Sequence, residues 1–248
     1  MSAPVAIQPE KVIVFMLAYN AERTLAKTYE SLPDVLKPCV IVGDDCSTDR
    51  TSEVAKELGL RVIRHERNLN YGGNLKQLFK HFLSSEAEVA IELHADFQYD
   101  PSLTDLMAQY ILRGYFDILQ GNRIRTRAEA LAGGMPLYRY LGNRSLTLFQ
   151  NLWFGTVFGE WHSGLRAYSR RLMKECPFEG FSDTHSFASD IMMYAVAQGF
   201  RVGEAPCPVR YESDSSSVPL DKLFEYTFKT VAGAMKYPPG SRKPLRPL

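Results

Sequence analysis

The stretch VIVFMLAYN, residues 12–20, places seven consecutive apolar residues directly before a polar pair. A short, continuous apolar run is typical of a strand that is buried on both faces, as in a parallel sheet. Four shorter runs with the same character follow at residues 40–42, 60–63, 89–93 and 116–119. The sequence therefore predicts five buried strands.

Amphipathic stretches separate these strands. The clearest is spaced as one face of a helix and contains Leu75, Leu78, Phe79, Phe82 and Leu83. Strand and helix alternate five times with short connections, so we expect an α/β protein with a doubly wound, mostly parallel sheet and helices on both faces. Residues 202–209 contain two prolines and fit only an edge strand or an irregular strand.

The composition excludes several classes of protein. The 248 residues are 45% apolar and 23% charged, which is ordinary for a globular domain and excludes disorder and collagen. The net charge is only +1, so a nucleic-acid partner is not expected. No apolar run reaches the ~20 residues of a membrane span. We also find no secretory leader, and therefore expect a cytoplasmic protein.

Polar residues follow three of the predicted strands, at the point where each strand ends. They are Tyr19-Asn20, Asp44-Asp45 and the segment HADFQ at 94–98. Ligands of an open parallel sheet bind beyond the carboxyl ends of its strands, so these ends predict a ligand site. Neither GxGxxG nor GxxxxGK[ST] occurs there, which disfavours a dinucleotide or a P-loop nucleotide.

The segment HADFQ alternates an imidazole, a carboxylate and an amide at His94, Asp96 and Gln98. Such a trio can converge on one hard cation, which then bridges the oxygens of a bound diphosphate. The sequence therefore predicts a metal site at the end of the fourth strand.

Seven segments, in order, resemble the inverting glycosyltransferases of family two, and within them the polyprenyl-phosphate branch that includes dolichyl-phosphate mannose synthase. The segments are AYN (18–20), GDDCSTDRT (43–51), NLNYGGNL (68–75), HADFQYDP (94–101), GNR (121–123), HSGLRAYSRR (162–171) and GFRVGEAPCPVRY (199–211). The resemblance covers about residues 11 to 235. It implies the GT-A fold, a Rossmann-like architecture, and a GDP- or UDP-linked sugar as donor.

The resemblance also implies roles for individual residues. Those expected to bind the donor are Ala18, Tyr19, Asn20, Asp44, Asp45, Ala95 and Arg210. His94, Asp96 and Gln98 would hold Mg²⁺ or Mn²⁺, with Asp96 counted as catalytic. Arg123 and Arg139 would hold the phosphate of the acceptor, and Ser163 and Arg166 would lie beneath the donor sugar. His94 stands where the family usually has aspartate, which favours Mn²⁺ because imidazole is a softer ligand.

The leading acceptor is a polyprenyl phosphate. The arginine-rich residues 121–144 adjoin an aromatic-rich stretch at 145–161, and this pairing suits an anionic head with an apolar tail. A hydroxyl acceptor is the alternative; it needs a general base, for which Asp190 is the catalytic candidate. A non-catalytic nucleotide-sugar-binding protein remains a further alternative, because His94 removes a carboxylate from the metal site.

We expect residues 1–220 to form the glycosyltransferase domain and residues 221–248 to form an amphipathic helix with a basic tail. This last segment has six Lys and Arg against two Asp and Glu. Such a helix suits the surface of an anionic membrane and also suits packing on the domain. A peripheral position at the membrane is therefore one of the expectations.

Overall fold

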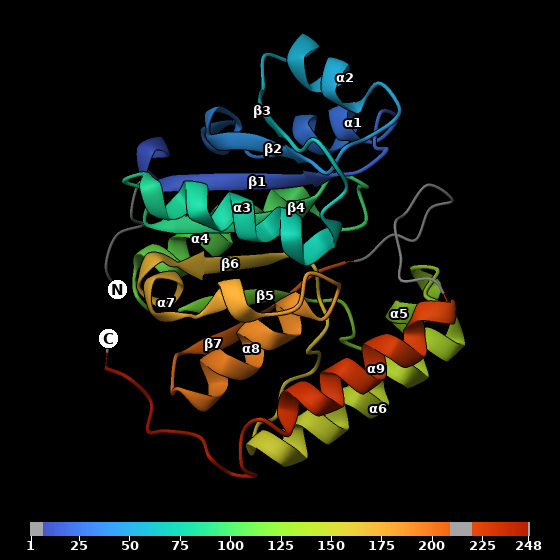
Figure 1. The fold of residues 1–248 in the computed structure, drawn as a ribbon, viewed down its shortest axis with the longest axis vertical. Helices are drawn as coiled ribbons and strands as arrows, with labels where there is room; N and C mark the ends of the chain where they lie inside the picture. Colours follow the sequence, from blue (N-terminus) through green and yellow to red (C-terminus); the bar gives the residue numbers. More distant parts are fainter. Residues whose placement is uncertain (1–6, 209–219, 248) are drawn as a thin grey trace.

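One seven-stranded sheet organises the chain, in the order β3-β2-β1-β4-β6-β5-β7 (Figure 1). The structure is a computed structural model and describes residues 7–208 and 220–247. The strands are β1 (Val12–Ala18), β2 (Val40–Asp44), β3 (Arg61–Arg64), β4 (Val89–His94), β5 (Ile118–Asn122), β6 (Arg166–Ser169) and β7 (Val202–Pro206). The α/β class and the mostly parallel sheet are confirmed, with β7 at an edge as its prolines predict.

Strand β6 was not among the predicted strands. It is four residues long, begins with an arginine, and pairs antiparallel with both β4 and β5. Its sequence, RAYS, has neither a long apolar run nor a clear alternation. The sheet is therefore parallel except at this one strand among the described residues.

Helices cover both faces of the sheet (Figure 1). They are α1 (Leu25–Glu30), α2 (Thr51–Glu57), α3 (Asn70–Ser84), α4 (Thr104–Leu112), α5 (Arg127–Ala132), α6 (Leu137–Phe154), α7 (Arg170–Glu175), α8 (Phe187–Ala197) and α9 (Leu220–Ala234). Short 3₁₀ turns lie at η1 (Pro9–Lys11), η2 (Asp34–Cys39), η3 (Pro101–Leu103) and η4 (Phe178–Gly180). Along β1, Phe15 packs into a core with α3, α7 and α8, and Val14 packs into a second core with α1, α2 and α4.

Close packing of the chain explains the two glycines of NLNYGGNL, Gly72 and Gly73. The amides of Gly72 and Gly73 both donate to the carbonyl of Asp183, at 2.8 and 3.3 Å. A Cβ on Gly72 would lie 2.5 Å from the carbonyl oxygen of Ser182. Only glycine permits so close an approach of α3 to the chain that leads into α8, and this approach brings Tyr71 to the site described below.

Helices α6 and α9 lie side by side beyond the carboxyl edge of the sheet (Figure 1). The indole N–H of Trp153 donates to the carbonyl of Tyr237, which fastens the end of α6 to the chain after α9. The tail then returns along α8, where the amide of Lys243 donates to the carbonyl of Ala197. Among the residues described, none of the helices combines the length and hydropathy that a membrane span requires.

Candidate active site

The strand register brings the three polar strand ends together. Leu17 of β1 stands opposite Gly43 of β2 on one side and opposite His94 of β4 on the other. The amide of Asp45 and the amide of Ala95 donate to the carbonyls of Ala18 and Leu17, at 3.0 and 2.9 Å. The residues that sequence reasoning placed at one edge of the sheet therefore lie at one edge.

Two of the predicted donor-binding side chains are used within the fold. Asn20, which has a positive φ of 51°, accepts the amide of Thr48 at 2.8 Å and so joins two strand-end loops. Asp44 is 0% exposed, and its carboxylate accepts the Ser47 amide at 2.8 Å and the Ser52 hydroxyl. Both side chains therefore hold the loops in shape, and their donor contacts stay a prediction.

The remaining residues at this edge differ in exposure. Tyr19 is 55% exposed, whereas Ala18 and Ala95 are buried. Asp45 is nearly buried and accepts the Leu69 amide at 2.7 Å. Burial raises the pKa of the Asp45 carboxyl, although this amide and His65 oppose the rise. Arg210, the last residue of the predicted donor set, lies outside the described residues.

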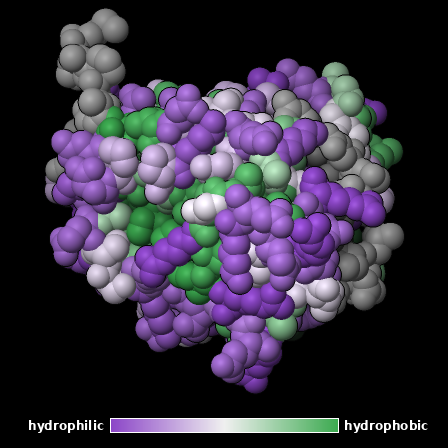
Figure 2. All heavy atoms as spheres, turned by 90° about the horizontal axis from the view of Figure 1, so that it is seen from above, coloured by the Kyte–Doolittle hydropathy of each residue, from purple (hydrophilic) through white to green (hydrophobic). Residues whose placement is uncertain are grey.

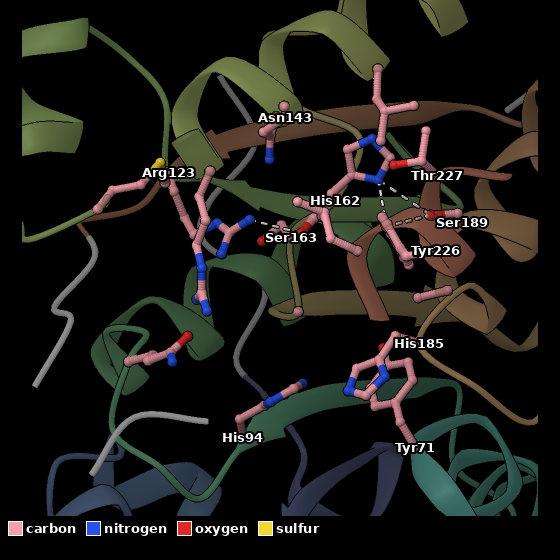
Figure 3. A pocket seen from close by; sticks show the side chains of 18 of the residues that line it. Tyr71, His94, Arg123, Asn143, His162, Ser163, His185, Ser189, Tyr226 and Thr227 are labelled. Carbon is pink, nitrogen blue, oxygen red and sulfur yellow. Dashed lines mark hydrogen bonds between the residues drawn. The ribbon is translucent and has the colours of Figure 1, made fainter. Parts of the chain in front are cut away.

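A pocket opens between this edge of the sheet and helices α6 and α9 (Figure 3). Six residues predicted from the sequence line it, namely His94, Gln98, Arg123, Arg139, Ser163 and Arg166. The other lining residues are Tyr71, Tyr99, Met135, Tyr138, Gly142, Asn143, Leu146, His162, Gly164, His185, Ala188, Ser189, Leu223, Tyr226 and Thr227. The pocket thus brings together two of the three predicted metal residues, both predicted acceptor arginines and the two residues expected beneath the donor sugar.

A row of four polar side chains crosses the sheet beneath the pocket. Glu92 of β4 is paired with Arg166 of β6, Arg166 with Gln120 of β5, and Gln120 with Glu204 of β7. Residues paired in register point to the same face of a sheet, so the four side chains form one continuous row, called here the polar row. Its first three members are at most 1% exposed.

The polar row holds the segment 159–161 in place. Glu204 accepts the amides of Gly159 and Glu160 at 2.7 and 2.9 Å. The side-chain amide of Gln120 donates to the carbonyl of Glu160, and Arg166 Nη2 donates to the carbonyl of Trp161 at 3.0 Å. Three strands therefore fix the backbone that carries Glu160 and His162 to the pocket.

Arg123, one of the two predicted acceptor residues, is paired inside the protein. Its Nε lies 2.9 Å from Oε1 of the buried Glu160, which also accepts the Asn143 amide at 2.9 Å. Burial alone would raise the pKa of Glu160, but the Arg123 guanidinium outweighs it and the pKa lies below its usual value. The positive charge of Arg123 is thus already balanced. Arg139 lies over the Tyr138 ring, with its guanidinium carbon 5.8 Å from the ring centre.

His162 connects the sheet edge to α9. Its Nδ1 lies 2.6 Å from the Tyr226 hydroxyl, which also contacts the Ser189 hydroxyl at 3.1 Å (Figure 3). Burial lowers the pKa of His162 to about 3, so the ring is neutral near pH 7. Its Nε2 is buried and has no hydrogen-bond partner within residues 7–208 and 220–247.

The predicted metal residues point in different directions. The His94 ring lies between Tyr71 and Tyr99, and its Nε2 is 3.7 Å from Oε1 of Glu92. Burial disfavours the protonated His94 ring, but Glu92 and Asp96 outweigh this and raise its pKa. Asp96 is nearly buried, and its carboxylate accepts the Gln98 amide at 3.1 Å.

In the part of the chain that the structure describes, no three His, Cys, Asp or Glu side chains gather as a ready metal cage. Mg²⁺ is commonly bound through one or two carboxylates together with substrate phosphates, and Asp96 with Gln98 would need substrate oxygens in this way. The third candidate ligand, His94 Nε2, has no hydrogen-bond partner among the described residues but lies beside Glu92, and it would bind a cation only as the neutral ring.

Asp190, the candidate general base, is turned away from the pocket. Its carboxylate accepts the amide of Ser182 at 3.4 Å and lies near Gly233 of α9. The neighbouring Ser189 lines the pocket instead. Burial raises the pKa of Asp190. The structure therefore does not bring this carboxylate to the predicted acceptor side.

Several pocket residues were not predicted. Tyr71 and His162 fall inside two of the quoted segments, NLNYGGNL and HSGLRAYSRR. These segments indicated the family, but nothing in them indicated that the two residues line a pocket. His185 stacks on Tyr71 with ring centres 5.7 Å apart. Tyr226 lies on a helix that was recognised only by its apolar spacing, and nothing in that spacing marks a hydroxyl that reaches the site.

Comparison with known proteins identifies the family. The family model described as glycosyl transferase family 2 matches residues 13–176. The chain therefore belongs to glycosyl transferase family 2 and is a glycosyltransferase that acts on nucleotide sugars. The expectation of an enzyme is confirmed, against the alternative of a non-catalytic binding protein.

The relatives agree with this assignment. An uncharacterized protein of Methanocaldococcus jannaschii is 29% identical over 91% of this chain and 93% of its own length. The low-salt glycan biosynthesis hexosyltransferase Agl6 of Haloferax volcanii is 30% identical over 83% of this chain and 49% of its own length. The UDP-N-acetylglucosamine–dolichyl-phosphate N-acetylglucosaminyltransferase of Methanococcus voltae is 26% identical over 82% and 87%.

A solved structure shares the fold. Glucosyl-3-phosphoglycerate synthase of Mycobacterium tuberculosis, in complex with Mg²⁺ and UDP, superposes with a TM-score of 0.69 at 19% identity. The match covers 91% of this chain and 78% of that one. The predicted GT-A fold is thereby confirmed.

The buried, neutral His162 predicts a specific pH dependence of stability. Below pH ~6.5 the ring is protonated in the unfolded chain and stays neutral in the folded protein until pH about 3, so acid favours unfolding. In the wild type, the free energy of unfolding should therefore fall by about 1.4 kcal/mol for each pH unit below pH ~6.5, and we expect His162→Gln to abolish this fall. Urea denaturation of both proteins at pH 7, 6 and 5 measures the free energy of unfolding, with His65→Gln as control. Parallel stability curves for wild type and His162→Gln would contradict the assignment.

Proposed function

We propose that this glycosyltransferase moves a sugar from a nucleotide diphosphate to a polyprenyl phosphate, with inversion at the sugar carbon and with a divalent cation. The observation that carries the proposal is the composition of the pocket. Arg139 and Arg166 line it together with the apolar side chains of Tyr138, Leu146 and Leu223. Guanidinium groups bind phosphate through charge-assisted hydrogen bonds, and apolar walls suit a prenyl chain.

The names of the relatives support the same acceptor. The Methanococcus voltae enzyme is named for transfer to dolichyl phosphate, and a dolichyl-phosphate hexose transferase of Haloferax volcanii is 24% identical over 81% of this chain. Two relatives that match across most of their own length therefore use a lipid phosphate by name.

A phosphate acceptor also explains the position of Asp190. A phosphomonoester is already ionised near neutral pH, since its second pKa is ~6, so its oxygen can attack without a general base. The carboxylate of Asp190 lies outside the pocket, where it cannot take a proton from a bound acceptor. Attack on the sugar carbon from the side opposite the departing nucleotide diphosphate inverts that carbon.

The remaining residues are assigned to the donor and the cation. We assign Asp96, Gln98 and His94 to Mg²⁺ or Mn²⁺, which when bound offsets the charge of the departing diphosphate. We assign the exposed Tyr19 and the nearly buried Asp45 to the nucleoside of a GDP- or UDP-linked donor. Asn20 and Asp44 contribute to donor binding indirectly, because they hold the loops that carry Tyr19 and Asp45.

Transfer assays test the proposal. We expect product with a short polyprenyl phosphate and none with the matching polyprenol, which lacks the anion that the arginines bind. We expect Asp96→Asn to lower kcat/KM by about 100-fold or more, because it removes the carboxylate ligand of the cation. Asp34→Asn, at a highly exposed aspartate far from the pocket, is the control.

Two results would contradict it. Equal transfer to alkyl glycosides and to the polyprenyl phosphate would favour a hydroxyl acceptor. Full activity of Asp96→Asn, or of the wild type in excess chelator, would show that transfer does not depend on a divalent cation. Parallel assays with GDP- and UDP-linked sugars identify the nucleotide.

The outer faces of α6 and α9 support a position at a membrane surface. Leu141, Leu148 and Leu152 of α6 fall within a narrow arc of the helix, and Phe224 and Phe228 of α9 are one turn apart; all five are more than half exposed. The view from above, onto the end of the molecule with α1 and α2, shows a hydrophobic area in the middle of a largely hydrophilic surface (Figure 2).

We propose that a lipid bilayer covers these apolar faces. Leu146 and Leu223 lie on the inner sides of the same two helices and line the pocket, so the pocket lies directly behind these apolar faces. A polyprenyl phosphate lies in a bilayer and could enter the pocket there. The exposed cations Lys236, Arg242 and Lys243 follow α9 and complement anionic lipid.

Sedimentation with vesicles that contain anionic phospholipid tests the bilayer contact. We expect Phe224→Glu together with Phe228→Glu to lower the bound fraction by about tenfold or more, since burial of each phenyl group contributes ~1.5–3 kcal/mol. The control places the same two glutamates at Val35 and Leu106, which are exposed apolar residues elsewhere. An equal loss in both variants, or none in either, would contradict the proposal.

A further inference from the structure

Arg166 is a buried cation whose hydrogen-bonding capacity is only partly used. The residue is 1% exposed and lines the pocket. Its Nη2 donates to the carbonyl of Trp161 at 3.0 Å, whereas Nε and Nη1 have no hydrogen-bond partner in the part of the chain that the structure describes. Buried guanidinium groups normally have their N–H groups satisfied, because an unpaired one is costly to desolvate. Two unpaired nitrogens at the base of a pocket therefore point to a ligand.

The neighbouring carboxylate does not satisfy these nitrogens. Glu92 is paired in register with Arg166, but its two oxygens accept the hydroxyls of Tyr71 and Tyr168. No ion pair between Glu92 and Arg166 is present within 4.0 Å among the residues described. Arg166 therefore differs from Arg123, which is in direct contact with Glu160.

His162 adds a third unpaired nitrogen, Nε2, to the two of Arg166. The backbone of Trp161, which Arg166 holds, leads directly into His162. His162 Nδ1 and the Tyr226 hydroxyl are hydrogen-bonded, and either of the two groups can be the donor. In the tautomer in which Nδ1 accepts, the neutral ring carries its proton on Nε2, which is buried and has no hydrogen-bond partner among the described residues. In that tautomer Nε2 is a donor, as Arg166 Nε and Nη1 are.

We propose that Arg166 and His162 form an oxyanion subsite that binds the phosphate of the acceptor. The inference rests on the proposed function for the identity of that phosphate. From the strand ends the pocket contains His94 and Gln98 but none of Ala18, Tyr19, Asn20, Asp44 and Asp45, and helices α6 and α9 form its outer wall. We therefore place the subsite on the side of the acceptor, away from the residues assigned to the nucleoside. Arg166, whose charge is not paired directly, then replaces Arg123 as the main cation of the acceptor phosphate, in place of the position beneath the donor sugar that the family resemblance implies.

The test compares Arg166→Lys with Arg171→Lys. The first variant keeps the charge and loses the planar fork of N–H groups. The second makes the same change at an arginine that pairs with Asp117 outside the pocket. Calorimetric titrations with inorganic phosphate, with a short polyprenyl phosphate, and with GDP and UDP in Mg²⁺ give the affinities.

We expect Arg166→Lys to raise the Kd of the polyprenyl phosphate and of inorganic phosphate by about tenfold or more, with no change for the nucleotide. Arg171→Lys should leave the Kd of both phosphate ligands unchanged. His162→Gln, which keeps an amide donor, should give a smaller loss for the same two ligands. In kinetics, the acceptor KM should rise and the donor KM should not.

Other outcomes overturn the inference. A loss confined to the nucleotide would assign the subsite to the diphosphate of the donor. Unchanged affinities for all ligands would make Arg166 a purely structural residue. If Arg166→Lys does not fold, the double variant Glu92→Gln and Arg166→Gln, which removes both buried charges, takes its place. We expect the same rise in the Kd of the polyprenyl phosphate and of inorganic phosphate. Failure of the proposed function is distinct, since it appears as absent transfer to polyprenyl phosphate by the wild type.

Discussion

The polar row across four strands is the constraint on which the pocket depends. Glu92, Arg166, Gln120 and Glu204 are buried or half-buried and stand side by side in register. Buried polar groups need hydrogen-bond partners, and the backbone of residues 159–161 provides one or two for each of Arg166, Gln120 and Glu204. That backbone in turn delivers Glu160 to Arg123 and His162 to Tyr226. A polar layer inside the sheet therefore builds the wall of the site and secures α9 to it.

The charges of the pocket follow from the same arrangement. Arg123 and Glu160 are in contact and balance each other, while His162 is kept neutral by burial. Arg166 shares its surroundings with Glu92 without direct contact, and Arg139 adds a further cation at the wall. The described lining thus carries more positive than negative charge. A phosphate that enters would find charge already in place, with little reorganisation needed.

Sequence reasoning located most of the strands and the edge where the site lies, because buried runs and polar strand ends are local patterns. It missed β6, since four residues that begin with a buried arginine carry no apolar period. It could not reveal the pairing of Arg123 with Glu160, since the two residues lie 37 positions apart and only the fold brings them together. Nor could it reveal the internal hydrogen bonds of Asp44 and Asp190, because a carboxylate at a strand end or on a helix does not show in the sequence which way it faces.

The most direct measurement is a crystal structure of the protein with a short polyprenyl phosphate. The account predicts phosphate oxygens within hydrogen-bond distance of Arg166, with the prenyl chain leaving between α6 and α9. A phosphate bound instead among the loops that follow β1 and β2, with the pocket beside α9 empty, would contradict it.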